Sequence, residues 1–182
     1  YFHSAAEGVD CLLRTTNVSK KCMSKTFFEN GFDQLDRAIL EALQVNSRIS
    51  VADLARKIHL SQPAVHQRIK RLERAGIIEK YVALVNREAV GYDLLCFIRV
   101  SIQPHTKAQL EGFQKVIEEL PSVLECYRTA GSHDLLLKVA VQDHKELDRF
   151  IADHLMTIAG VERIEASPVL NEMKSTTALK LK

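Results

Sequence analysis

The second half of this chain contains the same strand–helix–strand pattern twice, at a spacing of 39 residues. The first copy reads LLCFIRVSI, TKAQLEGFQKVIEEL and SVLECYRTA, and the second reads DLLLKVAVQ, HKELDRFIADHLMTI and VERIEASPVL. Two such units predict a four-stranded antiparallel sheet with both helices on one face, the ferredoxin-like βαββαβ arrangement, over residues 93–182. Because there are only two copies, we expect a duplicated domain and not a solenoid.

The face of this sheet that the helices leave open is predicted to carry alternate residues of the strands. The set that points outward is one of two, Cys96, Ile98 and Val100 or Leu135, Leu137 and Val139. Both sets are apolar, and a large exposed apolar patch usually marks a partner surface. We therefore expect a homodimer that packs sheet to sheet.

Residues 33–80 instead carry the signals of three short helices. Asp33, Ser50 and Ser61 stand where N-caps are expected, Pro63 suits a first helical turn, and Gly76 suits a stop. Apolar side chains recur at helical spacing and predict a small core. They are Leu35, Ile39, Leu43, Leu54, Ile58, Val65, Ile69 and Leu72.

The stretches IIEKYVALV and REAVGYD follow the third helix and suggest one or two short strands and a turn. We expect residues 33–80 to be a winged helix-turn-helix domain and residues 81–92 to be a linker strand. The predicted fold class is therefore α+β, with the winged helix-turn-helix first and the ferredoxin-like domain second.

Charge is divided unevenly between the two halves. The net charge of the whole chain, +2, is too small to imply a polyanionic partner by itself. Residues 33–80 contain nine Lys and Arg against six Asp and Glu, whereas residues 92–182 contain eleven against thirteen. Residues 61–76 alone hold four cations and one anion, so the basic excess lies mainly on the third helix.

A basic third helix that follows a tight turn is typical of a helix-turn-helix protein, which places this helix in the major groove of DNA. Gln62 and His66 near its start are expected to reach base edges, and Lys70, Arg71 and Arg74 to contact phosphates. The whole predicted DNA-binding set is Ser50, Ser61, Gln62, Pro63, Ala64, His66, Gln67, Arg68, Lys70, Arg71 and Arg74. Charge alone would also fit a solvated surface helix, but the layout of the three helices favours double-stranded DNA.

Residues 33–182 resemble the leucine-responsive regulatory protein/AsnC family, the feast/famine regulators. LDRAILEALQVNSRISVADLARKIHLSQPAVHQRIKRLERAGII is similar to the winged helix-turn-helix of that family. TAGSHDLLLKVAV and GVERIEASPVLNEMKSTTALKL are similar to parts of its ligand-sensing domain. The resemblance implies a transcription regulator that dimerises through its sheets, often forms octamers and binds small effectors, commonly amino acids, between dimers.

The same resemblance implies an effector site around a Gly-x-x-Asp turn. Its residues are Thr129, Gly131, Ser132, His133, Asp134 and Leu135. The chemistry agrees in part, because Gly131 permits a tight turn and the Asp134 carboxylate can pair with an α-ammonium group. The alternative is a plain β-hairpin in which Asp134 bonds only the turn backbone.

Two other classes of function were weighed. An enzyme is disfavoured, because no nucleophile–base–orienter set, phosphate-binding glycine loop or paired metal ligands can be assembled, and we expect no cofactor or metal. An architectural protein that compacts DNA without an effector shares every feature except the effector site, and this alternative stays open.

The remaining features concern the location of the protein. Residues 1–32 are expected to be an N-terminal extension, part of which precedes a natural start at Met23. The four cysteines are scattered, and Cys96 and Cys126 lie in apolar runs that suit reduced thiols. No apolar run approaches the roughly 18 residues of a membrane span. We expect a cytoplasmic, nucleoid-associated protein of a prokaryote.

Overall fold

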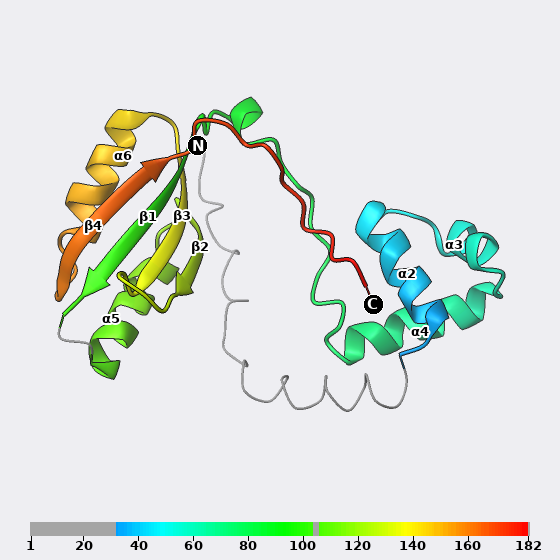
Figure 1. Cartoon of the computed structure of the whole chain (residues 1–182). Helices are drawn as coiled ribbons and strands as arrows, with labels where there is room; N and C mark the ends of the chain where they lie inside the picture. The colour runs from blue at the N-terminus through cyan, green and yellow to red at the C-terminus, as the bar shows by residue number, and fades with distance from the viewer. Residues whose placement is uncertain (1–31, 104–105, 182) are drawn as a thin grey trace, which may run out of the picture. The chain divides into compact units, whose positions relative to one another are not determined.

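The computed structural model describes residues 32–103 and 106–181, which form two compact units (Figure 1). One unit holds the described residues up to Val82 together with those from Thr176 onward, and the other is Ala83–Ser175. The predictions for residues 1–31 lie outside the described residues. None of the helices in the described part of the chain is long and apolar enough to cross a bilayer.

The first unit contains the three predicted helices, α2 (Gln34–Val45), α3 (Val51–Ile58) and α4 (Gln62–Arg74). Each begins at its predicted cap, because the side chains of Asp33, Ser50 and Ser61 accept the backbone N–H groups of the first turns. One apolar cluster joins the helices, with Ile39, Leu54, Val65 and Leu72 wholly buried. The helix-turn-helix prediction is confirmed.

The predicted strands after the third helix are not formed. Gly76 stops α4 with a positive φ of 68°, and residues 79–86 then run without strand pairing. A short 3₁₀ helix, η1 (Glu88–Val90), follows. The linker strand over 81–92 is therefore wrong for this chain: a strand needs a neighbour for its N–H and C=O groups, and no described segment provides one. Tyr81, Val82, Leu84 and Val85 all remain exposed.

The second unit is the predicted four-stranded antiparallel sheet, in the order β2-β3-β1-β4. Its elements are β1 (Leu94–Ile102), α5 (Lys107–Glu118), β2 (Val123–Arg128), β3 (Leu135–Val141), α6 (His144–Phe150), the π-helical η2 (Ile151–Leu155) and β4 (Val161–Pro168). Phe113 of α5 and Phe150 of α6 belong to one core cluster with β1 and β3, so both helices cover the same face. This is the ferredoxin-like arrangement.

The prediction for the open face was wrong. Ile98 is paired with Leu137 and Val100 with Leu135, so the two apolar sets of the strands share one face. That face lies under the helices and is buried. The open face carries the residues between them, and it mixes the half-buried Phe97 with charged groups such as the Lys138–Glu125 ion pair.

The tail after β4 returns to the first unit. The amide of Gln44 on α2 donates from Nε2 to the carbonyl of Leu179 at 3.1 Å, and the Leu179 N–H donates to its Oε1 at 2.6 Å. Leu181 packs against the apolar cluster of the three helices. Residues 176–181 were predicted to belong to the ferredoxin-like domain, but they belong to the unit of α2, α3 and α4 instead.

Candidate nucleic-acid interface and effector turn

Helix α4 presents a polar face to solvent. Val65 and Leu72 are buried on its inner side, whereas Gln62, His66 and Gln67 are exposed on the outer side. Lys70 and Arg74 extend this outer face toward the C-terminal end and form no ion pair with any described residue. The structure therefore brings together hydrogen-bonding groups at the start of α4 and free cations at its end.

A groove lies beside the start of α4. It has a volume of about 530 Å³ and is lined by Val51, Gln62, Pro63 and His66. Val51 is the first residue of α3, so the groove lies between the starts of α3 and α4. Three of these four residues, Gln62, Pro63 and His66, belong to the predicted DNA-binding set. The fourth, Val51, follows Ser50 of that set in the chain.

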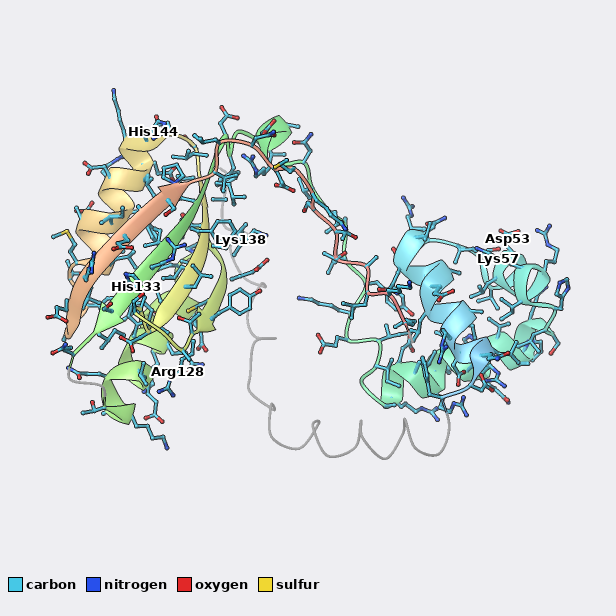
Figure 2. The ribbon with its side chains drawn as sticks, in the orientation of Figure 1. Asp53, Lys57, Arg128, His133, Lys138 and His144 are labelled. Carbon is cyan, nitrogen blue, oxygen red and sulfur yellow. The ribbon has the colours of Figure 1, made fainter. Side chains whose placement is uncertain are left out.

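Ser50 and Ser61 already have partners in this interface. Ser50 Oγ donates to Asp53 Oδ2 at 2.6 Å and accepts the Asp53 N–H at 3.0 Å. Ser61 Oγ accepts the Ala64 N–H at 3.4 Å. Both hydroxyls therefore serve as helix caps. Lys57 on α3, labelled in Figure 2, is an exposed cation that sequence reasoning omitted, although its position in the last turn before the tight turn was a usable signal.

Arg68 and Arg71 do not lie on the free outer face. Arg68 Nη1 donates to Asp36 Oδ1 at 2.8 Å and also lies 2.8 Å from Asp33 Oδ2, and Arg71 Nη2 donates to Asp36 Oδ2 at 2.5 Å. The Asp36 hydrogen bond is the main cause that raises the pKa of Arg68, although burial opposes it. Arg71 therefore differs from Lys70 and Arg74: its side chain is 43% exposed, but its guanidinium is held by Asp36 of α2, and its predicted phosphate contact stays a prediction.

Asp36 is the residue that sequence reasoning missed. Its side chain is 0% exposed, and no other charged or polar residue is buried among the described residues. A usable signal was present, because Asp36, Ile39, Leu40 and Leu43 recur at helical spacing and so share the inner face of α2. Asp36 also completes a capping box with Asp33, whose pKa is lowered by the Asp36 N–H and Arg68 against the opposing effect of burial.

The six predicted effector residues lie together in the turn between β2 and β3. Gly131, which has a φ of 145°, and Ser132 are exposed, whereas Leu135 is buried under the helices. The turn closes on itself: the Thr129 N–H donates to the Asp134 carbonyl at 2.8 Å, and Thr129 Oγ1 donates to the His133 carbonyl at 2.8 Å.

Asp134 has a structural partner. Its Oδ2 accepts the N–H of Ile102, at the end of β1, at 2.9 Å. Its own N–H donates to the carbonyl of Val100 at 3.0 Å. One carboxylate oxygen is therefore committed to β1, outside the hairpin, and not to the turn backbone that the plain-hairpin alternative names.

His133 is a largely enclosed side chain of the turn. It is 11% exposed, and its Nε2 lies 3.2 Å from Glu165 Oε2 of β4 without hydrogen-bond geometry. Its Nδ1 lies 3.0 Å from Ser132 Oγ. Figure 2 labels His133 in this turn. Because Nε2 is itself buried, it faces the Glu165 carboxylate and not solvent.

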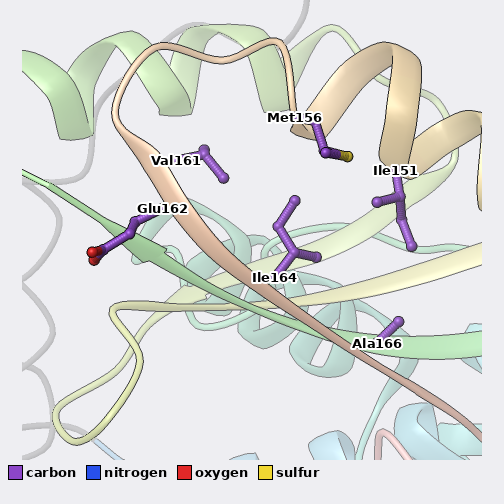
Figure 3. Close-up of a pocket in the computed structure, with 6 residues that line it drawn as sticks. All are labelled: Ile151, Met156, Val161, Glu162, Ile164 and Ala166. Carbon is purple, nitrogen blue, oxygen red and sulfur yellow. The ribbon is translucent and has the colours of Figure 1, made fainter.

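A second hollow in this unit lies between η2 and β4 (Figure 3). It has a volume of about 320 Å³, and its lining is apolar except for one carboxylate. The lining residues are Ile151, Met156, Val161, Glu162, Ile164 and Ala166. None of them is a cation that could pair with an α-carboxylate, so the hollow suits an apolar group better than a whole amino acid.

The first unit has three helices, and the last of them has a basic outer face; this arrangement defines a helix-turn-helix DNA-binding protein. The ferredoxin-like unit that follows is a second domain of a kind that regulators carry. Comparison with known families agrees. Residues 32–79 match the winged helix-turn-helix DNA-binding family, and residues 95–179 match the Lrp/AsnC ligand binding domain.

Individual relatives cover almost the whole described chain. The chain is 33% identical over 150 residues to the HTH-type transcriptional regulator FL11 of Pyrococcus furiosus, covering 82% of this chain and 97% of FL11. It is 31% identical to the leucine-responsive regulatory protein of Klebsiella pneumoniae, with 82% and 92% covered. A Neisseria meningitidis transcriptional regulator solved as a complex with L-Met aligns with a TM-score of 0.78 at 37% identity, covering 81% and 96%. The chain belongs to the Lrp/AsnC family of transcriptional regulators.

Proposed function

We propose that the protein regulates transcription by binding specific sites in double-stranded DNA through α4. The exposed Gln62, His66 and Gln67 read base edges, and Lys70 and Arg74 contact phosphates. The observation that carries this proposal is the division of α4 into a buried apolar side and an outer side with unpaired cations. We assign the protein to the cytoplasm, associated with the nucleoid.

An amino acid is the proposed effector, and the turn at 129–135 is its proposed site. The negative charge of Asp134 and the exposed backbone at Gly131 are groups that can meet an ammonium and a main chain. The complex of the Neisseria relative with L-Met supports this class of ligand. We propose that the ligand acts by changing how dimers assemble into larger oligomers such as octamers.

The homodimer is supported by apolar side chains that one chain leaves uncovered. Tyr127 on the open face of the sheet is 51% exposed, and Leu84 and Val85 after the DNA-binding helices are 76% and 68% exposed. Residues 79–86 also run without a strand-pairing partner among the residues that the structure describes. Burying such side chains and pairing such a segment are both possible when a second copy supplies the missing surface.

A panel of the free amino acids tests the proposal. DNA affinity is measured by fluorescence anisotropy, and oligomer size by light scattering, with and without each amino acid. At least one amino acid is expected to change both quantities, because a ligand shifts assembly only if it binds one state better. If none changes either quantity, the effector part of the proposal is wrong.

An architectural DNA-binding role without an effector is the second candidate. One observation favours it: the Asp134 carboxylate accepts the Ile102 N–H of β1 and Thr129 Oγ1 donates to the His133 carbonyl, so both side chains already serve the protein's own backbone. In that case DNA binding is insensitive to the whole panel while compaction of long DNA persists. The panel therefore separates the two candidates.

A further inference from the structure

The carboxylate of Asp36 joins the first helix of the DNA-binding unit to the recognition helix. Its two oxygens are divided between two guanidiniums, with Arg68 on Oδ1 and Arg71 on Oδ2. Arg68 is 24% and Arg71 is 43% exposed in the side chain, whereas Asp36 is wholly buried. A buried carboxylate is costly unless it is paired and hydrogen-bonded, so the carboxylate strongly favours the arrangement that keeps both arginines on it.

The two arginines are three residues apart and therefore lie on the same side of α4. Successive residues of a helix are turned by about 100° around its axis. A rotation of α4 by one position would carry both guanidiniums away from Asp36 and replace the outward residues by their neighbours. Holding both arginines thus fixes which side chains of α4 face outward.

We propose that Asp36 is a positioning residue for DNA recognition: it withdraws Arg68 and Arg71 from the DNA-contacting set and sets the rotation of α4 that presents Gln62, His66 and Gln67. This rests on the proposed DNA-binding function. A phosphate-contacting Arg71 would supply affinity on any sequence, whereas an Arg71 held by Asp36 contributes to the choice of sequence.

The test begins with a duplex that the wild-type full chain selects from random DNA, and a scrambled duplex of the same composition. In the variant Asp36→Asn the amide holds the guanidiniums less strongly. We expect the ratio of the affinity for the selected duplex to the affinity for the scrambled duplex to fall about tenfold or more. We also expect the log–log salt slope on the scrambled duplex to steepen by about one, because the released Arg71 can reach a phosphate while Asp33 still holds Arg68.

Glu41→Gln is the matched control. Glu41 lies on the same helix, is exposed, and its replacement makes the same change in net charge. It should leave the ratio and the slope as they are in the wild type. Asp36→Asn could instead lower the affinities for the selected and the scrambled duplex by the same factor and leave the salt slope unchanged. That result would mean that Asp36 only stabilises the fold, and it would overturn the proposal.

Arg71→Gln is a second test, and it does not require the Asp36→Asn variant to fold. In Arg71→Gln the Asp36 carboxylate keeps its ion pair with Arg68. A positioning role predicts a lower affinity ratio with an unchanged salt slope. A slope shallower by about 0.9 with an unchanged ratio would identify Arg71 as a phosphate contact and refute the proposal. Wild-type protein that selects no duplex would instead refute the proposed DNA-binding function itself.

Discussion

The double variant Lys70→Gln/Arg74→Gln tests whether the outer face of α4 contacts the DNA backbone. Both cations are exposed and unpaired among the described residues, so their removal leaves the packing of α4 unchanged. Each lost phosphate contact lowers the magnitude of the log–log salt slope by about 0.9. For each bound recognition helix the slope should therefore become shallower by about 1.8.

This change of slope is large enough to measure. Between about 50 and 200 mM salt, a fourfold increase, a slope difference of about 1.8 corresponds to about a twelvefold difference in the loss of affinity. The assay is fluorescence anisotropy of a labelled duplex over a series of salt concentrations. Lys115→Gln/Lys145→Gln removes two exposed cations from the helices of the other unit and serves as the control. Equal slopes for the wild type and the α4 variant would mean that these cations do not contact phosphates.

Three further predictions concern single residues. Gln62→Ala should cost about 1–3 kcal/mol on the preferred duplex and little on a scrambled one, and equal losses on both would mean that Gln62 does not read bases. Ser61→Ala removes the cap of α4 and should lower the free energy of unfolding by about 1 kcal/mol in a urea titration; no change would show that the long 3.4 Å bond contributes nothing. Asp134→Asn keeps an oxygen for the Ile102 N–H but removes the charge, so the fold should persist while the response of oligomer size to an active amino acid is lost. A response with an unchanged midpoint would assign Asp134 to the hairpin alone.

The elements that local chemistry specifies were predictable from the sequence. The caps at Asp33, Ser50 and Ser61 fixed the starts of three helices. The repeat at a spacing of 39 residues fixed the order of the sheet, and the predicted LLCFIRVSI segment is β1 itself. These features depend on residues close in sequence or on a pattern that occurs twice.

The features that depend on distant partners were not predictable in the same way. In the sequence Arg71 looks like a phosphate contact, because it lies among other cations. Its partner Asp36 is 35 residues earlier in the chain, and the two meet only because α2 packs against α4. Residues 81–85 have the composition of a strand but no strand neighbour in the described part of the chain. The π-helical turn at η2 likewise replaces the end of a helix that periodicity predicts as regular. For Arg71 and for residues 81–85 the deciding factor is tertiary contact.

The return of residues 176–181 to the DNA-binding unit has a consequence for how the protein folds. In topological terms the ferredoxin-like unit is an insertion within the DNA-binding unit, which is completed by chain on both sides of it. The Gln44–Leu179 contact spans 135 residues, and contacts of such long sequence separation form late because the loop must close first. During synthesis the recognition helix emerges early, but its domain gains its last packing residue, Leu181, only after β4 has been made. A nascent or truncated chain therefore carries the DNA-reading surface on an unfinished domain.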